Sequence, residues 1–289
     1  MKHPALASDA FLHDVAQARH EPGLHLWWLG QSGFLVLWNH RFLLLDPYLS
    51  DSLTRKYAAT DKPHVRMTER VIAPERLGFI DVVTSSHNHT DHLDPESLRP
   101  LARANPELIM VCPEANRATV RERSGLADHA LRGVNAGEQV EASGFQLHAI
   151  PAAHETLDVD KSGRHLYLGF VVQAGPYRLV HTGDTVRYDG LAERWIPPGT
   201  DVALFPINGR GPERRVAGNL WGAEAAQLAR DIRAGTVIPC HYDMFEFNTA
   251  TPDAFETECR RLGQPFITLA QGARLSLPPR TAPRPDSPS

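Results

Sequence analysis

The sequence predicts an α+β fold, a four-layer αββα sandwich in which two β-sheets pack face to face and helices cover their outer faces. Two β-rich blocks begin near Leu24 and Leu166, and each combines short apolar runs with helical segments. A sheet with an apolar face has to bury that face against another layer. The length of 289 residues and the hydrophobic content of 42% suffice for one sizeable core.

The predicted helices and strands of the first half of the chain begin with a helix near the N-terminus. Segment 1–23 is expected to be a helical extension, in which Ser8 is suited to cap a helix over about 9–19. From Leu24, the runs LHLWWL, FLVLW and RFLLLD are separated by the turn signals GQSG and NH, which predicts a meander of three strands. The block continues with strands at 80–85 and 108–111, helices at 95–104 and 113–123, and strands near 130–134 and 145–151.

The second block repeats this texture and completes a predicted single domain over 24–277. Strands are expected in LYLGFVVQA, LVHTG, DVALFPI, TVIPC and PFITLA, and helices at 223–234 and 252–262. Residues 278–289, PPRTAPRPDSPS, contain five prolines and no large apolar side chain. They cannot bury enough apolar surface to offset the entropy of ordering, so we expect a disordered proline-rich tail.

Composition excludes several classes of protein. A formal net charge of -4 argues against an extended nucleic-acid surface. No run approaches the roughly 18 apolar residues of a membrane span, and no signal-peptide run opens the chain, so a cytoplasmic location is expected. Three cysteines without CxxC spacing indicate free thiols. Fifteen histidines, about 5% of the chain, are the anomaly, because histidine is the commonest metal ligand.

The segment SSHNHTDHLD places three histidines and an aspartate directly after a predicted strand. A tight loop that leaves a strand can aim His87 and His89 at one point, and Asp91 and His92 at a neighbouring point. This geometry suits two divalent metal ions that lie close together. Imidazole and carboxylate ligands without thiolate favour Zn²⁺, with Mn²⁺ or Fe²⁺ as alternatives.

Other polar residues also follow apolar runs directly. They are Asp46, His154, Asp184, Asn208 and His241. Ligands of layered α/β folds gather where strands end, so these residues are expected to form one rim with the histidine motif if the strands are in register.

The histidine motif resembles the HxHxDH signature of the metallo-β-lactamase superfamily, and the resemblance extends over about 24–277. Matching pieces follow in the family's order: Asp46 in LLLDPY, His154, Asp184 in HTGDT, and His241 in IPCHYD. The resemblance implies an αββα fold with one site at the sheet edges. It also implies one metal bound by His87, His89 and His154, a second bound by Asp91, His92 and His241, and Asp184 as the bridge between them.

The expected mechanism uses a metal-bridging hydroxide, with Asp91 as the catalytic residue that orients it and takes a proton. Two divalent cations, two carboxylates and one hydroxide leave a net charge of about +1, so the site stays electrophilic. The runs WWLGQSGFLV, LLLDPYLS, HTGDT and VIPCHYDMF are similar to the L-ascorbate-6-phosphate lactonase (UlaG-like) group. This similarity implies hydrolysis of a small anionic ester such as a lactone, although that group's pattern lacks the histidine found here at His154.

Further residues are predicted to support the ligands or to bind substrate. Asp46 is expected to hold a ligand histidine by its second ring nitrogen, and His181 to lie behind the ligands or to be structural. An arginine at a strand-end rim can bind a carboxylate or phosphate with two hydrogen bonds. The candidates for substrate binding are Arg187, Tyr188, Asn208 and Arg210. Arg214 and Arg215 are expected to be solvated loop charges.

Phosphodiester hydrolysis, of a lipid or a nucleotide, is the main alternative because it uses the same metals. Nuclease activity on RNA is disfavoured by the acidic charge, and β-lactamase activity by the lack of that branch's substrate-binding positions. A redox role is disfavoured because flavodiiron proteins carry a flavodoxin domain and a carboxylate in the first motif. A metal-holding scaffold is a minor alternative. The partner is expected to be a small, anionic substrate, and a homo-oligomer stays open.

Overall fold

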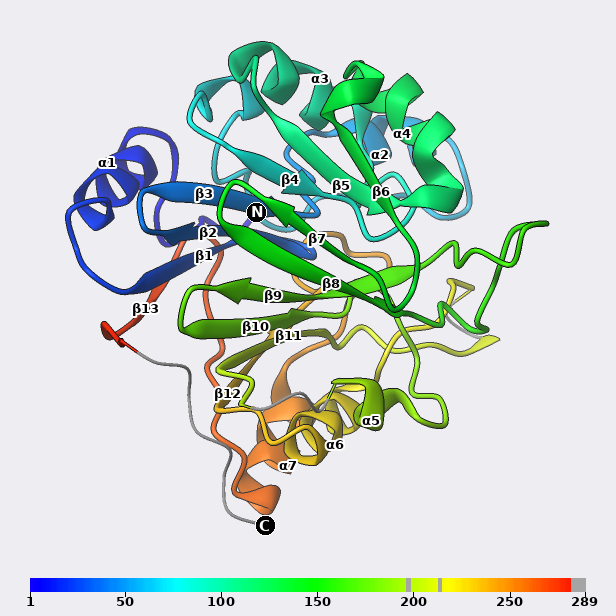
Figure 1. Ribbon diagram of the computed structural model, residues 1–289. Coiled ribbons are helices and arrows are strands. Elements are labelled where there is room, and N and C mark those ends of the chain that lie inside the picture. Colours follow the sequence, from blue (N-terminus) through cyan, green and yellow to red (C-terminus); the bar gives the residue numbers. More distant parts are fainter. Residues whose placement is uncertain (196–198, 213–214, 282–289) are drawn as a thin grey trace.

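Two mixed β-sheets lie face to face at the centre of the structure, and helices cover both outer sides (Figure 1). The computed structural model describes residues 1–195, 199–212 and 215–281. Within these ranges, one sheet has seven strands and the other has six. The predicted αββα sandwich is therefore confirmed.

The seven-stranded sheet combines the N-terminal half of the chain with one C-terminal strand. Its strands, in spatial order, are β13 (Arg274–Leu277), β1 (Leu24–Gly30), β2 (Gly33–Trp38), β3 (Arg41–Leu45), β4 (Val82–Thr84), β5 (Ile109–Pro113) and β6 (Leu131–Val134). Strands β1 to β3 form the predicted antiparallel meander. Strands β3 to β6 pair in parallel, which brings the carboxyl ends of β3 and β4 to the same edge of the sheet.

The six-stranded sheet forms the second inner layer. Its strands, in spatial order, are β12 (Thr236–Cys240), β11 (Val202–Pro206), β10 (Tyr177–His181), β9 (Leu168–Ala174), β8 (Phe145–Pro151) and β7 (Gln139–Ala142). Strands β7 to β10 are antiparallel, and β10 to β12 are parallel. The ends of β8, β10 and β12 thus point the same way and can place their following residues at one edge.

Helices cover each sheet on its outer side (Figure 1). Beside the first sheet lie α1 (Ser8–Ala18), α2 (Ser52–Tyr57), α3 (Pro95–Ala104) and α4 (Arg117–Ser124), with 3₁₀ turns η1 (Pro74–Arg76), η2 (Glu114–Asn116) and η3 (Asp128–Ala130). Beside the second lie α5 (Leu191–Trp195), α6 (Gly222–Asp231) and α7 (Asp253–Leu262). No helix in the described part of the chain has the length and apolar content needed to cross a membrane.

Strand β1 shows why its sequence is apolar without a break. Leu26 and Trp28 belong to the core between the two sheets. Trp27 and Leu29 point the other way, into a second core beneath the helices that also contains Phe11 of α1. Because neighbouring side chains of a strand face opposite sides, a strand covered on both sides must be apolar at nearly every position.

The prediction of a strand in PFITLA is wrong. Phe266 makes only an isolated bridge to Val237, and the N–H of Ile267 donates to the carbonyl of Val237. The chain then turns at Gly272, whose φ of +81° suits glycine, and crosses to the first sheet as β13. Apolar content alone indicated a strand at 265–270, whereas pairing with β1 places it at 274–277.

Residues near both ends of the described chain contact the sandwich. Phe11 of α1 is completely buried in the helix-covered core. At the other end, the hydroxyl of Tyr177 donates to the carbonyl of Pro278 at 2.7 Å, and Arg280 pairs with Asp201 at 2.5 Å. The predicted tail 278–289 therefore begins with residues that contact the second sheet, and its remaining part, 282–289, lies outside the described residues.

Replacement of Phe11 by alanine tests whether α1 is part of the cooperative core. We expect the free energy of unfolding to fall by about 3 kcal/mol, because a buried aromatic ring is removed without replacement. His13→Ala on the exposed side of α1 is the control and should stay within about 0.5 kcal/mol of the wild type. Urea unfolding followed by circular dichroism measures both, and equal midpoints for the two variants would show that α1 does not contribute.

Candidate metal centre

Seven predicted ligands meet at the edge where the strands end. His87, His89, Asp91 and His92 lie in the loop after β4, while His154 follows β8, Asp184 follows β10 and His241 follows β12. Three groups of side chains could each hold a metal ion, because within each group the potential ligand atoms lie within 4.8 Å of one another. The groups are His87, His89 and His154; His87, His92 and Asp184; and Asp91, His92 and His241. The first and third groups coincide with the two ligand sets that the sequence resemblance implies.

Asp184 lies between these two sets. Its Oδ2 is 3.7 Å from Nε2 of His154 and 3.3 Å from Nε2 of His241. Its Oδ1 is 3.2 Å from Nε2 of His92. The carboxylate thus faces histidines of both groups, as a bridging ligand would. Gly183, at φ +59°, lets the chain pass Ser86 here, since a Cβ would lie 2.5 Å from that of Ser86.

Buried polar atoms without hydrogen bonds show that this cluster fits a metal. Nε2 of His87, Nε2 of His92 and Oδ1 of Asp184 are buried and make no hydrogen bond within the described structure. Buried polar atoms nearly always have a partner, so each needs an explanation. Imidazole nitrogens and carboxylate oxygens that converge in this way are the donors that zinc, manganese and iron accept.

The pKa values of the cluster show that it favours added positive charge. Burial lowers the pKa of His87 well below its usual value, which keeps this imidazole neutral and able to bind a metal. Burial also opposes a charge on His241, but Asp184 and Asp91 outweigh it and raise its pKa to about 9. The same carboxylates raise the pKa of His92 well above its usual value. A divalent cation would supply the charge that the carboxylates demand.

The structure places Asp46 behind His92, at the position that its predicted supporting role requires. It is completely buried, and its Oδ2 lies 2.8 Å from Nδ1 of His92, which turns the Nε2 of that ring toward the cluster. The carboxylate also accepts hydrogen bonds from the Thr84 hydroxyl at 2.9 Å and from the N–H of Ser86 at 3.0 Å. A carboxylate behind a histidine ligand selects its tautomer and orients its ring.

His181 lies deeper than the ligands. Its Nε2 is 2.9 Å from the carbonyl oxygen of Ser32, and its ring meets Phe34 edge-on. Burial lowers its pKa, so the ring is a neutral donor in the core. Among the two roles predicted for His181, these contacts favour the structural one.

The predicted substrate residues are engaged elsewhere, and none of them lines the cavity at the metal cluster. Arg187 pairs with Asp231, and Arg210 pairs with Glu224 through two hydrogen bonds of 2.6 and 2.7 Å. Because helix α6 supplies both carboxylates, neither arginine is free to bind an anion. This corrects the anion-binding role expected for Arg187 and Arg210.

The two other substrate candidates make internal hydrogen bonds as well. The hydroxyl of Tyr188 donates to the carbonyl of Pro151 at 2.5 Å. Asn208 donates to Asn248 at 2.8 Å and accepts from Asn219 at 3.0 Å, so it ties two loops together. Arg214 lies outside the described residues.

Sequence reasoning missed the residues that surround the cluster. Gln31, in the turn between β1 and β2, donates from Nε2 to Oδ2 of Asp91 at 2.9 Å. A cavity of about 500 Å³ opens over the cluster, and its outer wall comes from segments 53–64, 215–217 and 245–248. The turn sequence GQSG could have indicated Gln31, whereas no sequence motif marks the residues of the outer wall.

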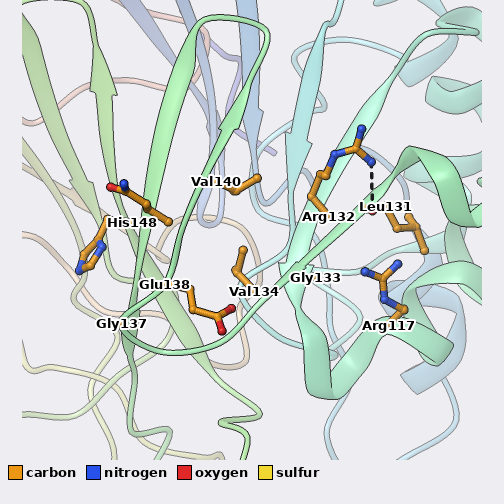
Figure 2. Close-up of a pocket in the computed structure, with 10 residues that line it drawn as sticks. Arg117, Leu131, Arg132, Gly133, Val134, Gly137, Glu138, Val140 and His148 are labelled. Carbon is orange, nitrogen blue, oxygen red and sulfur yellow. Dashed lines mark hydrogen bonds between the residues drawn. The ribbon is translucent and has the colours of Figure 1, made fainter.

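A second cavity, of about 580 Å³, lies at the outer edges of the two sheets, where β6 meets β7 (Figure 2). Arg117 and His148 line it, and Arg117 is paired with Glu114 at 2.9 Å. None of the seven predicted ligands lines this cavity. The chemistry of the chain is therefore concentrated at the other site.

A two-sheet αββα sandwich with a histidine and aspartate cluster at its strand ends defines the metallo-β-lactamase class of proteins. The family described as "Beta-lactamase superfamily domain" matches residues 41–242, and the chain belongs to this family. A protein of Methanosarcina mazei named "UPF0173 metal-dependent hydrolase" is 27% identical over 262 residues, which cover 88% of this chain and 99% of that protein. These matches confirm the predicted superfamily and enzyme class, a metal-dependent hydrolase.

Solved structures show the same fold. Igni18, a metallo hydrolase from Ignicoccus hospitalis, matches with a TM-score of 0.64 and 19% identity, over 88% of this chain and 98% of its own. A possible metal-dependent hydrolase from Veillonella parvula matches with a TM-score of 0.69 and 14% identity, over 89% of this chain and 99% of its own. At these identities the likeness concerns the fold.

Asp46→Asn tests the support of His92. The amide puts an N–H₂ group where the carboxylate accepts hydrogen bonds, so His92 loses its orientation. We expect metal affinity to fall by about 10- to 100-fold, the usual effect of a lost carboxylate partner. Competition with a chelator measures this. The control is Asp81→Asn, because Asp81 accepts hydrogen bonds from Arg41 and from the N–H of Phe42. Equal affinity in both variants would contradict the role given to Asp46.

Proposed function

We propose that this chain hydrolyses a small anionic ester, most simply a lactone, with two divalent metal ions, zinc foremost. The observation that carries the proposal is the position of Asp184 between the two ligand groups. The potential ligands around this single carboxylate suffice for two ions rather than one. A scaffold that only holds a metal would not need a cavity of about 500 Å³ directly over it.

When bound, the metal pair would lower the pKa of water toward neutrality and polarise the oxygen of the attacked group. Asp91 is the carboxylate best placed to work beside it. Its side chain lines the cavity, and its Oδ2 is held by Nε2 of Gln31 at 2.9 Å. His92 and His241 outweigh burial and keep the pKa of Asp91 well below its usual value, so the group is ionised and can orient a water molecule by accepting its hydrogen bond.

Hydrolysis of a phosphodiester is the second candidate, because the same ligand set serves phosphoryl transfer. The lactonase-like substrate rests on the similarity of WWLGQSGFLV, LLLDPYLS, HTGDT and VIPCHYDMF to the UlaG-like group. We further propose a cytoplasmic enzyme with a small-molecule substrate and no nucleic-acid partner, in line with the formal charge of -4. Manganese or iron would suit the same donors.

Removal of a ligand tests the two-metal proposal. His87→Ala and Asp184→Ala should each lose bound metal and hydrolytic activity together, because His87 and Asp184 contribute to a shared cluster. Metal analysis of the purified proteins gives the number of ions per chain. His148→Ala removes a histidine outside the cluster and should keep both ions. Two ions per chain in Asp184→Ala would show that the bridging assignment is wrong.

A substrate screen separates the two reactions. The zinc-loaded protein should hydrolyse lactones, with a smaller rate or none on bis-p-nitrophenyl phosphate. Activity on the diester alone would contradict the lactonase proposal and favour the phosphodiesterase. Inactivity on both, with two ions bound, would favour the non-catalytic scaffold.

A further inference from the structure

The cavity over the metal cluster has a positively charged outer half. Two of its charged lining residues, Asp91 and Asp184, belong to the cluster. In the described part of the chain, every other charged residue of the lining is basic. These residues are Lys56, Lys62, Arg123 and Arg215. Their charge would remain above the metal site whichever ion is bound there.

Three of these cations lack a carboxylate partner in the described structure. Nζ of Lys56 lies over the ring of Tyr57, 5.1 Å from its centroid, and the other two, Lys62 and Arg123, are held by carbonyl oxygens. Nζ of Lys62 donates to the carbonyl oxygen of Arg215 at 2.6 Å. Nη1 of Arg123 donates to the carbonyl oxygen of Asn88 at 2.6 Å, in the ligand loop. Carbonyl oxygens hold these side chains in place without neutralising them, and each retains further donors. Arg215 differs, because its guanidinium pairs with Asp61 at 2.6 Å.

An aromatic wall stands beside these cations. The ring of His64 stacks on Tyr57, with centroids 4.5 Å apart and planes at 26°, and lies 5.4 Å from the ring of Phe247. Nδ1 of His64 is 2.8 Å from the carbonyl of Lys62 and therefore donates to it, which holds the ring in place. Burial lowers the pKa of His64, so the wall is uncharged. A wall of this kind suits a flat apolar group.

We propose that the substrate is an ester with a planar apolar group and a separate anionic group, a carboxylate or a phosphate, away from the bond that is cleaved. Lys62 and Arg123 bind the anion, and the wall of Tyr57, His64 and Phe247 receives the planar group. This proposal rests on the hydrolase function proposed above. It places anion recognition on the outer wall of the cavity, in place of Arg187 and Arg210.

A matched pair of esters tests the proposal. Phenyl acetate and 4-acetoxybenzoate share the reacting ester and the ring, and only the second carries a remote carboxylate. The zinc-loaded wild type should show the larger kcat/KM for 4-acetoxybenzoate. Lys62→Met should lower that value by about fivefold, mainly through KM, because one partly exposed ion pair is lost. The value for phenyl acetate should not change.

The control is Lys161→Met, which removes the same charge from an exposed loop outside the cavity lining. It should leave both esters unaffected. Arg123→Met should repeat the selective loss, and its metal content must be measured because Arg123 also contacts the ligand loop. An equal loss of both esters, or an unchanged preference in Lys62→Met and Arg123→Met with full metal content, would overturn the proposal.

Binding separates failure of the inference from failure of the proposed function. If neither ester is hydrolysed, calorimetric titration of the zinc-loaded protein with benzoate and with neutral benzamide still reports recognition. Tighter binding of benzoate that Lys62→Met weakens by about fivefold would support the cationic wall while the esterase function fails. Benzoate binding that is equal in the wild type and Lys62→Met would indicate coordination to the metal only, and would overturn the inference.

Discussion

The charge balance of one buried cluster is the constraint on which the rest of the structure depends. Asp184 is 4% exposed and lies among His92, His154 and His241, where water screens its charge only weakly. A buried carboxylate is tolerated only when charge and hydrogen bonds compensate it. The strand ends therefore have to deliver histidines from both sheets to one place. Asp46, itself fully buried, extends the same requirement one layer deeper, because it must be held by Thr84 and its neighbours.

The backbone is strained at three residues around the buried cluster. Gln31, Asp46 and His241 all have positive φ, at 49°, 37° and 60°, although none is glycine. Such conformations cost about 1–3 kcal/mol each and persist only where surrounding contacts enforce them. The N–H of His241 donates to the carbonyl of Gln31 at 2.9 Å, which joins turns from the two sheets. The packing of the two extensive cores on either side of the first sheet stabilises the fold and offsets this local free-energy cost.

The site divides its tasks between the sandwich and the segments laid over it. The predicted ligands follow strands directly, so the sheets determine their positions, and the fold is shared with other members of the superfamily. The outer wall comes from α2, the segment that follows it, residues 215–217 between β11 and α6, and the loop after β12. Substrate recognition commonly lies on such segments because they vary without disturbing the scaffold. In the proposed function, the catalytic chemistry and the choice of substrate are therefore carried by physically separate parts of this chain.

The sequence by itself determined the sandwich, most of its strands, and the seven residues expected to bind metal, whereas β7 and β13 were not predicted. These are local properties, because apolar runs give the strands and each expected ligand stands a few residues beyond one. The tertiary structure decided which charges are free. Arg187 and Arg210 look like anion-binding residues until α6 supplies Asp231 and Glu224 to neutralise them, whereas Lys62 and Arg123 carry no motif and stay unneutralised. Pairing of charges depends on proximity in space, which composition and spacing along the chain do not contain.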